Sequence, residues 1–100
     1  MRVYAGAGAD AVRSLAAGET VTLAAVAAAS ADEEDEFDAL LTAADDGPVV
    51  VTAEVEDFAG TQTPVTLADV QAFHLDADGS GDLAWYAPSE VADVVAFLDR

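Results

Sequence analysis

The residues best suited to chemistry are four oxygen-bearing side chains in a short segment, DADGSGDL, near the C-terminus. They are Asp76, Asp78, Ser80 and Asp82. Their spacing is typical of a calcium loop, in which oxygen ligands alternate with small residues and a glycine follows at the sharp turn. The bidentate glutamate that closes such a loop is replaced by Ala87, and the nearest glutamate, Glu90, comes three residues later. We therefore expect calcium binding in about the millimolar range at best.

The same segment also has the composition of a tight β-hairpin turn. Aspartate and glycine tolerate the left-handed backbone that such turns require, and aspartate side chains cap them. The flanking residues 72–76 and 83–87 are rich in aromatic and apolar side chains, as hairpin strands are. We interpret residues 76–82 as a hairpin turn and keep a calcium site as the alternative.

His74 is the only histidine, and it lies within the first predicted strand of this hairpin. Side chains alternate along a strand, so His74 and Asp76 point to one face, where Trp85 could join them across the hairpin. These residues would form a small polar pocket. A general base needs a nucleophile or a substrate proton within reach, and the sequence pairs no such group with His74. We expect a structural histidine, and a small hydrolase or transferase centred on it stays open as an alternative.

Two further patterns admit a functional interpretation. Residues 6–11 (GAGADA) match the weak dinucleotide-binding pattern G-x-G-x-x-A, but the chain is too short for both halves of such a fold, and Asp10 would repel a pyrophosphate. The acidic run at 32–38 has the composition of a metal site or of a surface for a basic partner. A solvated helix face is the simpler interpretation, and it is the one we expect.

Charge excludes several classes of function. The 100 residues include 20 acidic and three basic side chains, all arginine, which gives a net charge of −17. Nucleic acids and anionic membrane surfaces bind through lysine and arginine, so both are excluded as partners of the chain alone. The absence of cysteine excludes disulfides and thiolate metal sites. Because molar salt screens such self-repulsion, the composition predicts adaptation to a salt-rich cytoplasm. High genomic GC content is the alternative explanation for the missing lysine and abundant alanine, but it explains less of the acidic excess.

The pattern of apolar residues predicts one α+β domain spanning residues 1–100. We expect strands at 2–5, 20–26, 49–55, 72–76 and 83–87, with the central 49–55 covered on both faces. Helices are expected at 10–17, from Ser30 to the stop at 47–48, at 67–70 and from Ser89 onward. Residues 56–64 are expected to form a loop. The order is β-α-β-α-β-α-β-β-α, with a mixed sheet of about five strands and three to four helices.

Side-chain spacing makes specific predictions about these helices. Ser30 and Glu33 form a capping-box pattern, as do Thr66 and Asp69, and Gly18 is placed to end the first helix. Two buried stripes follow from the helical period. They are Phe37, Leu40, Leu41 and Ala44 in the second helix, and Val91, Val94, Val95 and Leu98 in the last.

Five segments together resemble a family of small proteins found mostly in actinobacteria. They are MRVY at 1–4, DEEDEFDALL at 32–41, VVVTAEVED at 49–57, LADVQAFHLD at 67–76 and LAWYAPSEV at 83–91. The family is a domain of unknown function, so the resemblance implies no catalytic residue. Its members carry a longer acidic insert after the histidine. The resemblance therefore implies that residues 76–82 are a shortened connection, in agreement with the hairpin.

The sequence thus predicts a small cytoplasmic domain that acts through contact with other proteins. The N-terminal residues lack the apolar core of a targeting signal, and the apolar run at 21–29 is too short to span a bilayer. We expect no enzymatic activity and no cofactor, and either a protein partner or a homodimer. Weak calcium binding through residues 76–82 is the alternative function.

Overall fold

The computed structural model describes residues 1–28, 30, 32–56, 58, 60–76, 80 and 83–99. The elements in chain order are β1 (Arg2–Ala7), α1 (Ala9–Ala16), β2 (Val21–Ala27), α2 (Glu33–Ala44), β3 (Val49–Glu54), β4 (Gln62–Val65), η1 (Leu67–Asp69), β5 (Val70–Leu75), β6 (Ala84–Tyr86), η2 (Pro88–Glu90) and α3 (Val91–Leu98). Here η denotes a single turn of 3-10 helix.

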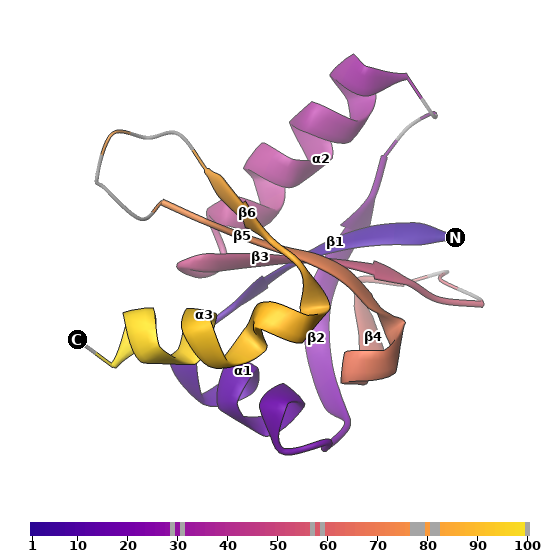
Figure 1. Cartoon of the computed structure of the whole chain (residues 1–100). Coiled ribbons are helices and arrows are strands. Elements are labelled where there is room, and N and C mark those ends of the chain that lie inside the picture. Colours follow the sequence, from indigo (N-terminus) through magenta and orange to yellow (C-terminus); the bar gives the residue numbers. More distant parts are fainter. Residues whose placement is uncertain are drawn as a thin grey trace.

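The strands form one sheet in the order β4-β2-β1-β3-β5-β6 (Figure 1). The α+β class is confirmed. The sheet has six strands rather than about five, and every neighbouring pair is antiparallel, where a mixed sheet was expected. The central strand β3 is buried along Val49–Ala53, as its continuous apolar run predicted.

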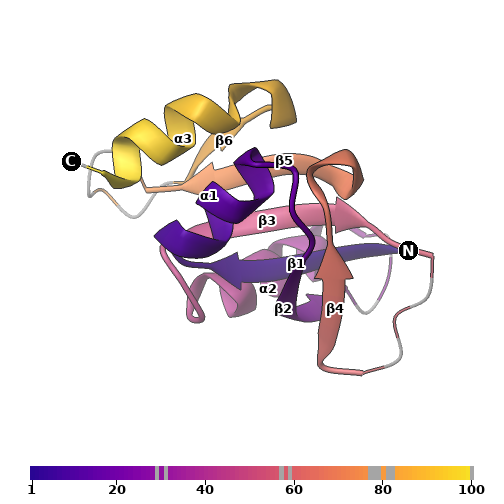
Figure 2. The same cartoon turned by 90° about the horizontal axis from the view of Figure 1, so that it is seen from below.

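The molecule has three layers, with α1 and α3 on one face of the sheet and α2 on the other (Figure 2). Side chains of β1 and β3 alternate between the two cores, as strand geometry requires. Val3 and Val51 share one core with Val12 and Leu15 of α1 and with Val94 of α3. Tyr4 and Val50 face α2. The sheet therefore presents its even-numbered positions in β1 and β3 to the α2 side.

Several local predictions are confirmed. Gly18 follows α1 with φ of +84°, a backbone conformation that favours glycine. The Asp69 carboxylate accepts hydrogen bonds from the amide and the hydroxyl of Thr66 at 3.0 and 3.1 Å. The strands β5 and β6 pair as a hairpin. In α3, Val94 is fully buried, and the rest of its predicted stripe packs against the same core.

The loop expected at 56–64 contains part of a strand that the sequence did not reveal. Gln62–Val65 pairs with β2 as β4, at one edge of the sheet. Proline inside the sequence QTPV argues against a strand in the middle of a sheet, since it lacks an amide hydrogen, but it is tolerated at an edge. Pro64 lies opposite Thr22 at this edge. The loop prediction was wrong because a strand can contain Pro64 only at an edge of the sheet. Only the strand order shows that β4 lies at an edge.

The predicted buried face of α2 is confirmed only in part, since Leu40 and Ala44 are partly buried against the core on this side of the sheet. Its buried residues are Ala39 and Ala43, whereas Phe37 and Leu41 are 57% and 46% exposed. The predicted capping box is also replaced by a different contact. Helix α2 begins after Asp32, and the Ser30 hydroxyl donates a 2.6 Å hydrogen bond to the Asp35 carboxylate instead of pairing with Glu33.

Two glycines explain why alanines form the buried face of α2. A Cβ on Gly6 in β1 would lie 2.5 Å from the carbonyl oxygen of Ala43, and one on Gly47 would lie 2.8 Å from the backbone of Ala7. Backbone therefore meets backbone at the C-terminal end of α2. Only a small residue fits on the helix at this approach, so Ala43 is buried against the sheet, whereas Phe37 and Leu41 are exposed.

Candidate functional site

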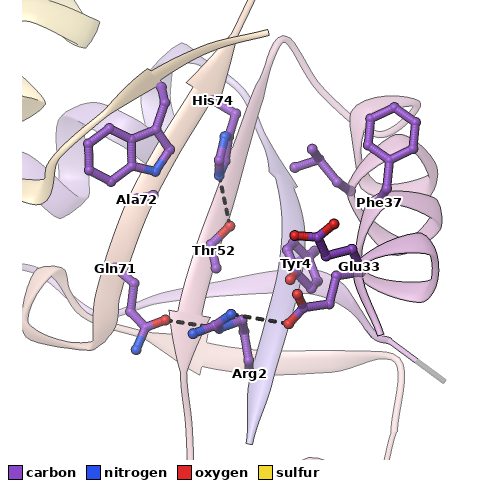
Figure 3. A pocket seen from close by; sticks show the side chains of 11 residues that line it. Arg2, Tyr4, Glu33, Phe37, Thr52, Gln71, Ala72 and His74 are labelled. Atoms are coloured by element: carbon purple, nitrogen blue, oxygen red, sulfur yellow. Dashed lines mark hydrogen bonds and ion pairs between the residues drawn. The ribbon is translucent and has the colours of Figure 1, made fainter. Parts of the chain in front are cut away.

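A cleft of about 410 Å³ lies beside α2, on the face of the sheet that this helix covers (Figure 3). Helix α2 packs on β1, β2 and β3. In the strand order, β5 and β6 follow β3 and so extend beyond the three strands on which α2 packs. The cleft is lined from β1, α2, β3, β5 and β6 by Arg2, Tyr4, Glu33, Glu36, Phe37, Leu40, Thr52, Gln71, Ala72, His74 and Trp85.

The floor of the cleft contains a hydrogen-bonded pair from neighbouring strands. Thr52 Oγ1 of β3 lies 3.0 Å from His74 Nε2 of β5. Thr52 is only 6% exposed, and His74 is half-buried. Burial lowers the pKa of His74 below its ordinary value of 6.5, because the charged imidazolium is poorly solvated there. The ring is therefore neutral at pH 7.

One end of the cleft is held by Arg2. Its Nε donates a 3.1 Å hydrogen bond to the Gln71 side-chain oxygen of β5, and its Nη1 donates one of 3.1 Å to the Glu36 carboxylate of α2 (Figure 3). Tyr4 lies beside this bridge. Burial, followed by the negative charge of Glu36, raises the pKa of Tyr4, and Arg2 acts in the opposite direction. The guanidinium thus connects three elements at the cleft.

The walls of the cleft are aromatic and exposed. Trp85 of β6 is 63% exposed, and Phe37 of α2 is 57% exposed. Trp85 is the cross-strand partner of His74 in the β5–β6 register, so the pairing of the hairpin fixes both at the same level of the sheet. Leu41, one turn after Phe37 on α2, is a third exposed apolar side chain and lies outside the lining of the cleft. Large apolar side chains left in solvent in this way are typical of a contact surface.

Only some of the predicted site residues lie in the cleft. His74 and Trp85 line one cleft, whereas Asp76 lies just after β5 and is not part of its lining. Ser80 is exposed, and Asp78 and Asp82 lie outside the described residues. The calcium site at 76–82 therefore stays a prediction, which a calcium titration followed by Trp85 fluorescence tests. Elsewhere in the described ranges, no three acidic or histidine side chains converge as a metal site would require.

The two weaker sequence patterns have structural explanations. Gly6 of the G-x-G-x-x-A pattern is packed against Ala43 and Asp46, so its missing side chain serves the contact with α2. In the acidic run, Asp32, Glu34 and Asp38 are exposed, as expected for a solvated helix face. Glu33 and Glu36 of the same run line the cleft.

Sequence reasoning missed five polar or aromatic residues of the cleft, namely Arg2, Tyr4, Phe37, Thr52 and Gln71. Alternation within strands signals that Thr52 shares a face with Val50, and His74 with Ala72. That β1, β3 and β5 are neighbours is a property of the strand order, which no local pattern encodes.

The cleft has some of the groups used in nucleophilic catalysis. A hydroxyl within hydrogen-bond distance of an imidazole is the first half of such a site. However, Thr52 is only 6% exposed, which restricts the access of a substrate carbonyl to its hydroxyl. The pKa of His74 is lowered by burial, which is opposite to the effect of an orienting carboxylate. The arrangement is better suited to binding than to acyl transfer.

No protein-family model matches the chain, and no curated protein or solved structure shows significant similarity to it. The resemblance to the family with the MRVY opening stays a prediction. Every helix in the described part of the chain is too short or too polar to cross a bilayer.

Proposed function

We propose that this protein is a non-enzymatic docking module that binds a short, positively charged segment of a partner protein in the cleft beside α2. The observation that carries the proposal is the exposure of Trp85 of β6 and Phe37 of α2, which both line that cleft. Aromatic side chains dominate the energetics of protein interfaces when a partner buries them. Leu41 extends the apolar surface along the outside of α2.

The shape of the cleft favours a polypeptide segment over a small molecule. A small ligand is usually buried over most of its surface by a largely preformed pocket. Here the aromatic walls are mostly in solvent, so a small molecule would be covered from one side only. A segment lying along α2 would instead cover Phe37 and Trp85 together and remove their apolar area from water.

Charge supports a basic partner rather than a second copy of the chain. The net charge of −17 repels another copy at low ionic strength and attracts a cationic segment. Glu33 and Glu36 bring this negative charge into the cleft itself. We propose a cytoplasmic protein adapted to high salt, in which apolar contacts hold the segment and charge selects it.

A peptide selection tests the docking function. A random peptide library displayed on phage is selected against the immobilised protein, and the recovered peptides are titrated in solution. We expect recovered peptides to combine lysine or arginine with large apolar residues. Trp85→Ala and Phe37→Ala should each weaken binding by about tenfold or more, as interface hot spots do. Gln62→Ala, an exposed change on the opposite sheet edge, is the matched control and should have no effect.

Two outcomes would contradict the proposal. The first is recovery of peptides whose binding shifts backbone amide resonances away from the cleft and is indifferent to Trp85→Ala and Phe37→Ala. The second is a stable dimer in sedimentation analysis that Trp85→Ala dissociates, which would make a second copy the occupant. A monomer is expected at low and high salt.

A further inference from the structure

We infer that the cleft contains a binding site for a guanidinium group, so that an arginine of the partner segment pairs with Glu33 and lies against Trp85. The inference rests on the proposed docking function and specifies its anchor. It follows from three features of the cleft, which are a carboxylate that pairs with no other described residue, an aromatic wall and a guanidinium already bound within the molecule.

The carboxylate is that of Glu33, in the first turn of α2. It lines the cleft and is exposed, and no hydrogen bond or ion pair engages it within the described part of the chain. Glu36, one turn further along, is already paired with Arg2 at 3.1 Å. With His74 neutral, the cleft carries one more negative charge than positive. An added cation would therefore complete the charge balance of the cleft.

Trp85 supplies a wall suited to the same ligand. An indole is the best of the aromatic side chains for attracting a cation, and arginine is found over aromatic faces more often than lysine. The guanidinium is planar and weakly hydrated, so it loses less on leaving water than an ammonium group does. The apolar stem of an arginine would also contact Phe37 while its charged head stays at Glu33.

The contacts of Arg2 show how side chains of this cleft bind a guanidinium group. Its head group donates to a side-chain amide on one side and to a carboxylate on the other, at 3.1 Å each. The same combination of neutral and charged oxygen acceptors suits the fork of N–H donors that arginine presents and lysine lacks. Arginine is therefore the favoured anchor.

The test compares two ligands that differ in charge and have nearly the same shape. N-acetyl-arginine amide and N-acetyl-citrulline amide are titrated up to about 50 mM, because a single anchoring group binds weakly. Trp85 fluorescence and amide chemical shifts report binding. The arginine derivative should bind at least about tenfold more tightly than the citrulline derivative, as expected for loss of an ion pair in a partly desolvated cleft.

Neighbouring glutamates provide a matched pair of variants. Glu33→Gln and Glu34→Gln each remove one negative charge from the first turn of α2, but only Glu33 lines the cleft. Glu33→Gln should weaken binding of the arginine derivative by about fivefold or more, and Glu34→Gln by less than about twofold. Circular dichroism checks that both variants fold. Equal effects of the two variants would mean general attraction to a negative surface and would overturn the inference.

The inference and the docking function fail in different ways. If the two derivatives bind equally, or neither binds, the guanidinium site is wrong. If peptides recovered from the selection still depend on Trp85 but tolerate replacement of every arginine by citrulline, docking stands and the anchor is again wrong. If those peptides bind outside the cleft, the docking function itself is wrong.

Discussion

The substitution Gly6→Ala tests how α2 is seated on the sheet. The added Cβ would lie 2.5 Å from the Ala43 carbonyl oxygen, whereas ordinary contact begins at 3.4 Å, so the two backbones must separate by about 0.9 Å. Cβ and main-chain carbon of Asp46 crowd the same position at 2.6 and 2.8 Å. Because two of these three contacts are with backbone, no change of rotamer relieves them.

We expect Gly6→Ala to lower the free energy of unfolding by about 2 kcal/mol, which is typical of overpacking in a close contact. For a domain of this size, that corresponds to a fall in melting temperature of about 8–16 °C. Thermal melts followed by circular dichroism at fixed KCl measure it. Gly60→Ala is the control, since nothing lies within 4 Å of a Cβ there. It should be neutral or slightly stabilising.

A melting temperature for Gly6→Ala within about 2 °C of the wild type would refute the close approach of α2 to β1. The double substitution Gly6→Ala with Asp46→Gly sharpens the result. It removes the side-chain contact only, so the clash with the Ala43 carbonyl remains, and stability should be recovered in part at most. Full recovery would place the clash on the Asp46 side chain instead of on the helix backbone.

Three further predictions follow from burial and charge. Leu15→Ala should lower the free energy of unfolding by about 2–5 kcal/mol because Leu15 is fully buried, whereas Leu41→Ala should change it by less than about 0.5 kcal/mol. Urea unfolding measures both values, and a larger loss for Leu41→Ala than for Leu15→Ala would contradict the assignment of the core. The pKa of His74, measured by NMR, should lie below 6.5. As the pH falls, the unfolded chain binds a proton at His74 before the folded chain does, so the contribution of His74 to stability is present above pH 6.5 and declines below it. Comparison with His74→Gln isolates this effect. Melting temperature should rise as KCl increases from about 0.1 to 2 M, because salt screens the excess negative charge, and a flat or falling curve would contradict adaptation to salt.

Local sequence signals predicted those elements whose cause is local. Consecutive apolar residues such as Val49–Val51 point to both faces of a sheet, so they are buried only in a central strand that is covered on both faces. The Thr66–Asp69 contact and the glycine after α1 depend on three or four neighbouring residues. Such features depend only on residues close in the sequence, and both are present in the structure.

The buried face of α2 was predicted only in part, because both sides of the helix carry apolar residues. A helical period identifies Phe37, Leu40, Leu41 and Ala44 as one stripe and Ala39 and Ala43 as another. The choice between them is made by Gly6 of β1, which is distant in sequence and leaves room for a methyl group only. Close approach of the backbones therefore outweighs the greater hydrophobicity of Phe37.

The cleft was only partly foreseeable for a similar reason. The hairpin predicted that His74 and Trp85 would be close, since cross-strand neighbours follow from the turn. Thr52 and Arg2 reach the same cleft because β3 and β1 follow β5 in the strand order. Their contribution comes from pairings across the sheet, and those depend on the whole fold.

The proline at the β4 edge has a consequence for self-association. Pro64 has no amide hydrogen, so a strand arriving at that edge lacks a donor at this position and meets a pyrrolidine ring instead. Fibrils that grow by edge-to-edge pairing need two receptive edges per molecule. With one edge blocked, association through β6 would end at a closed pair, and open-ended polymerisation is disfavoured even where concentrated salt removes electrostatic repulsion.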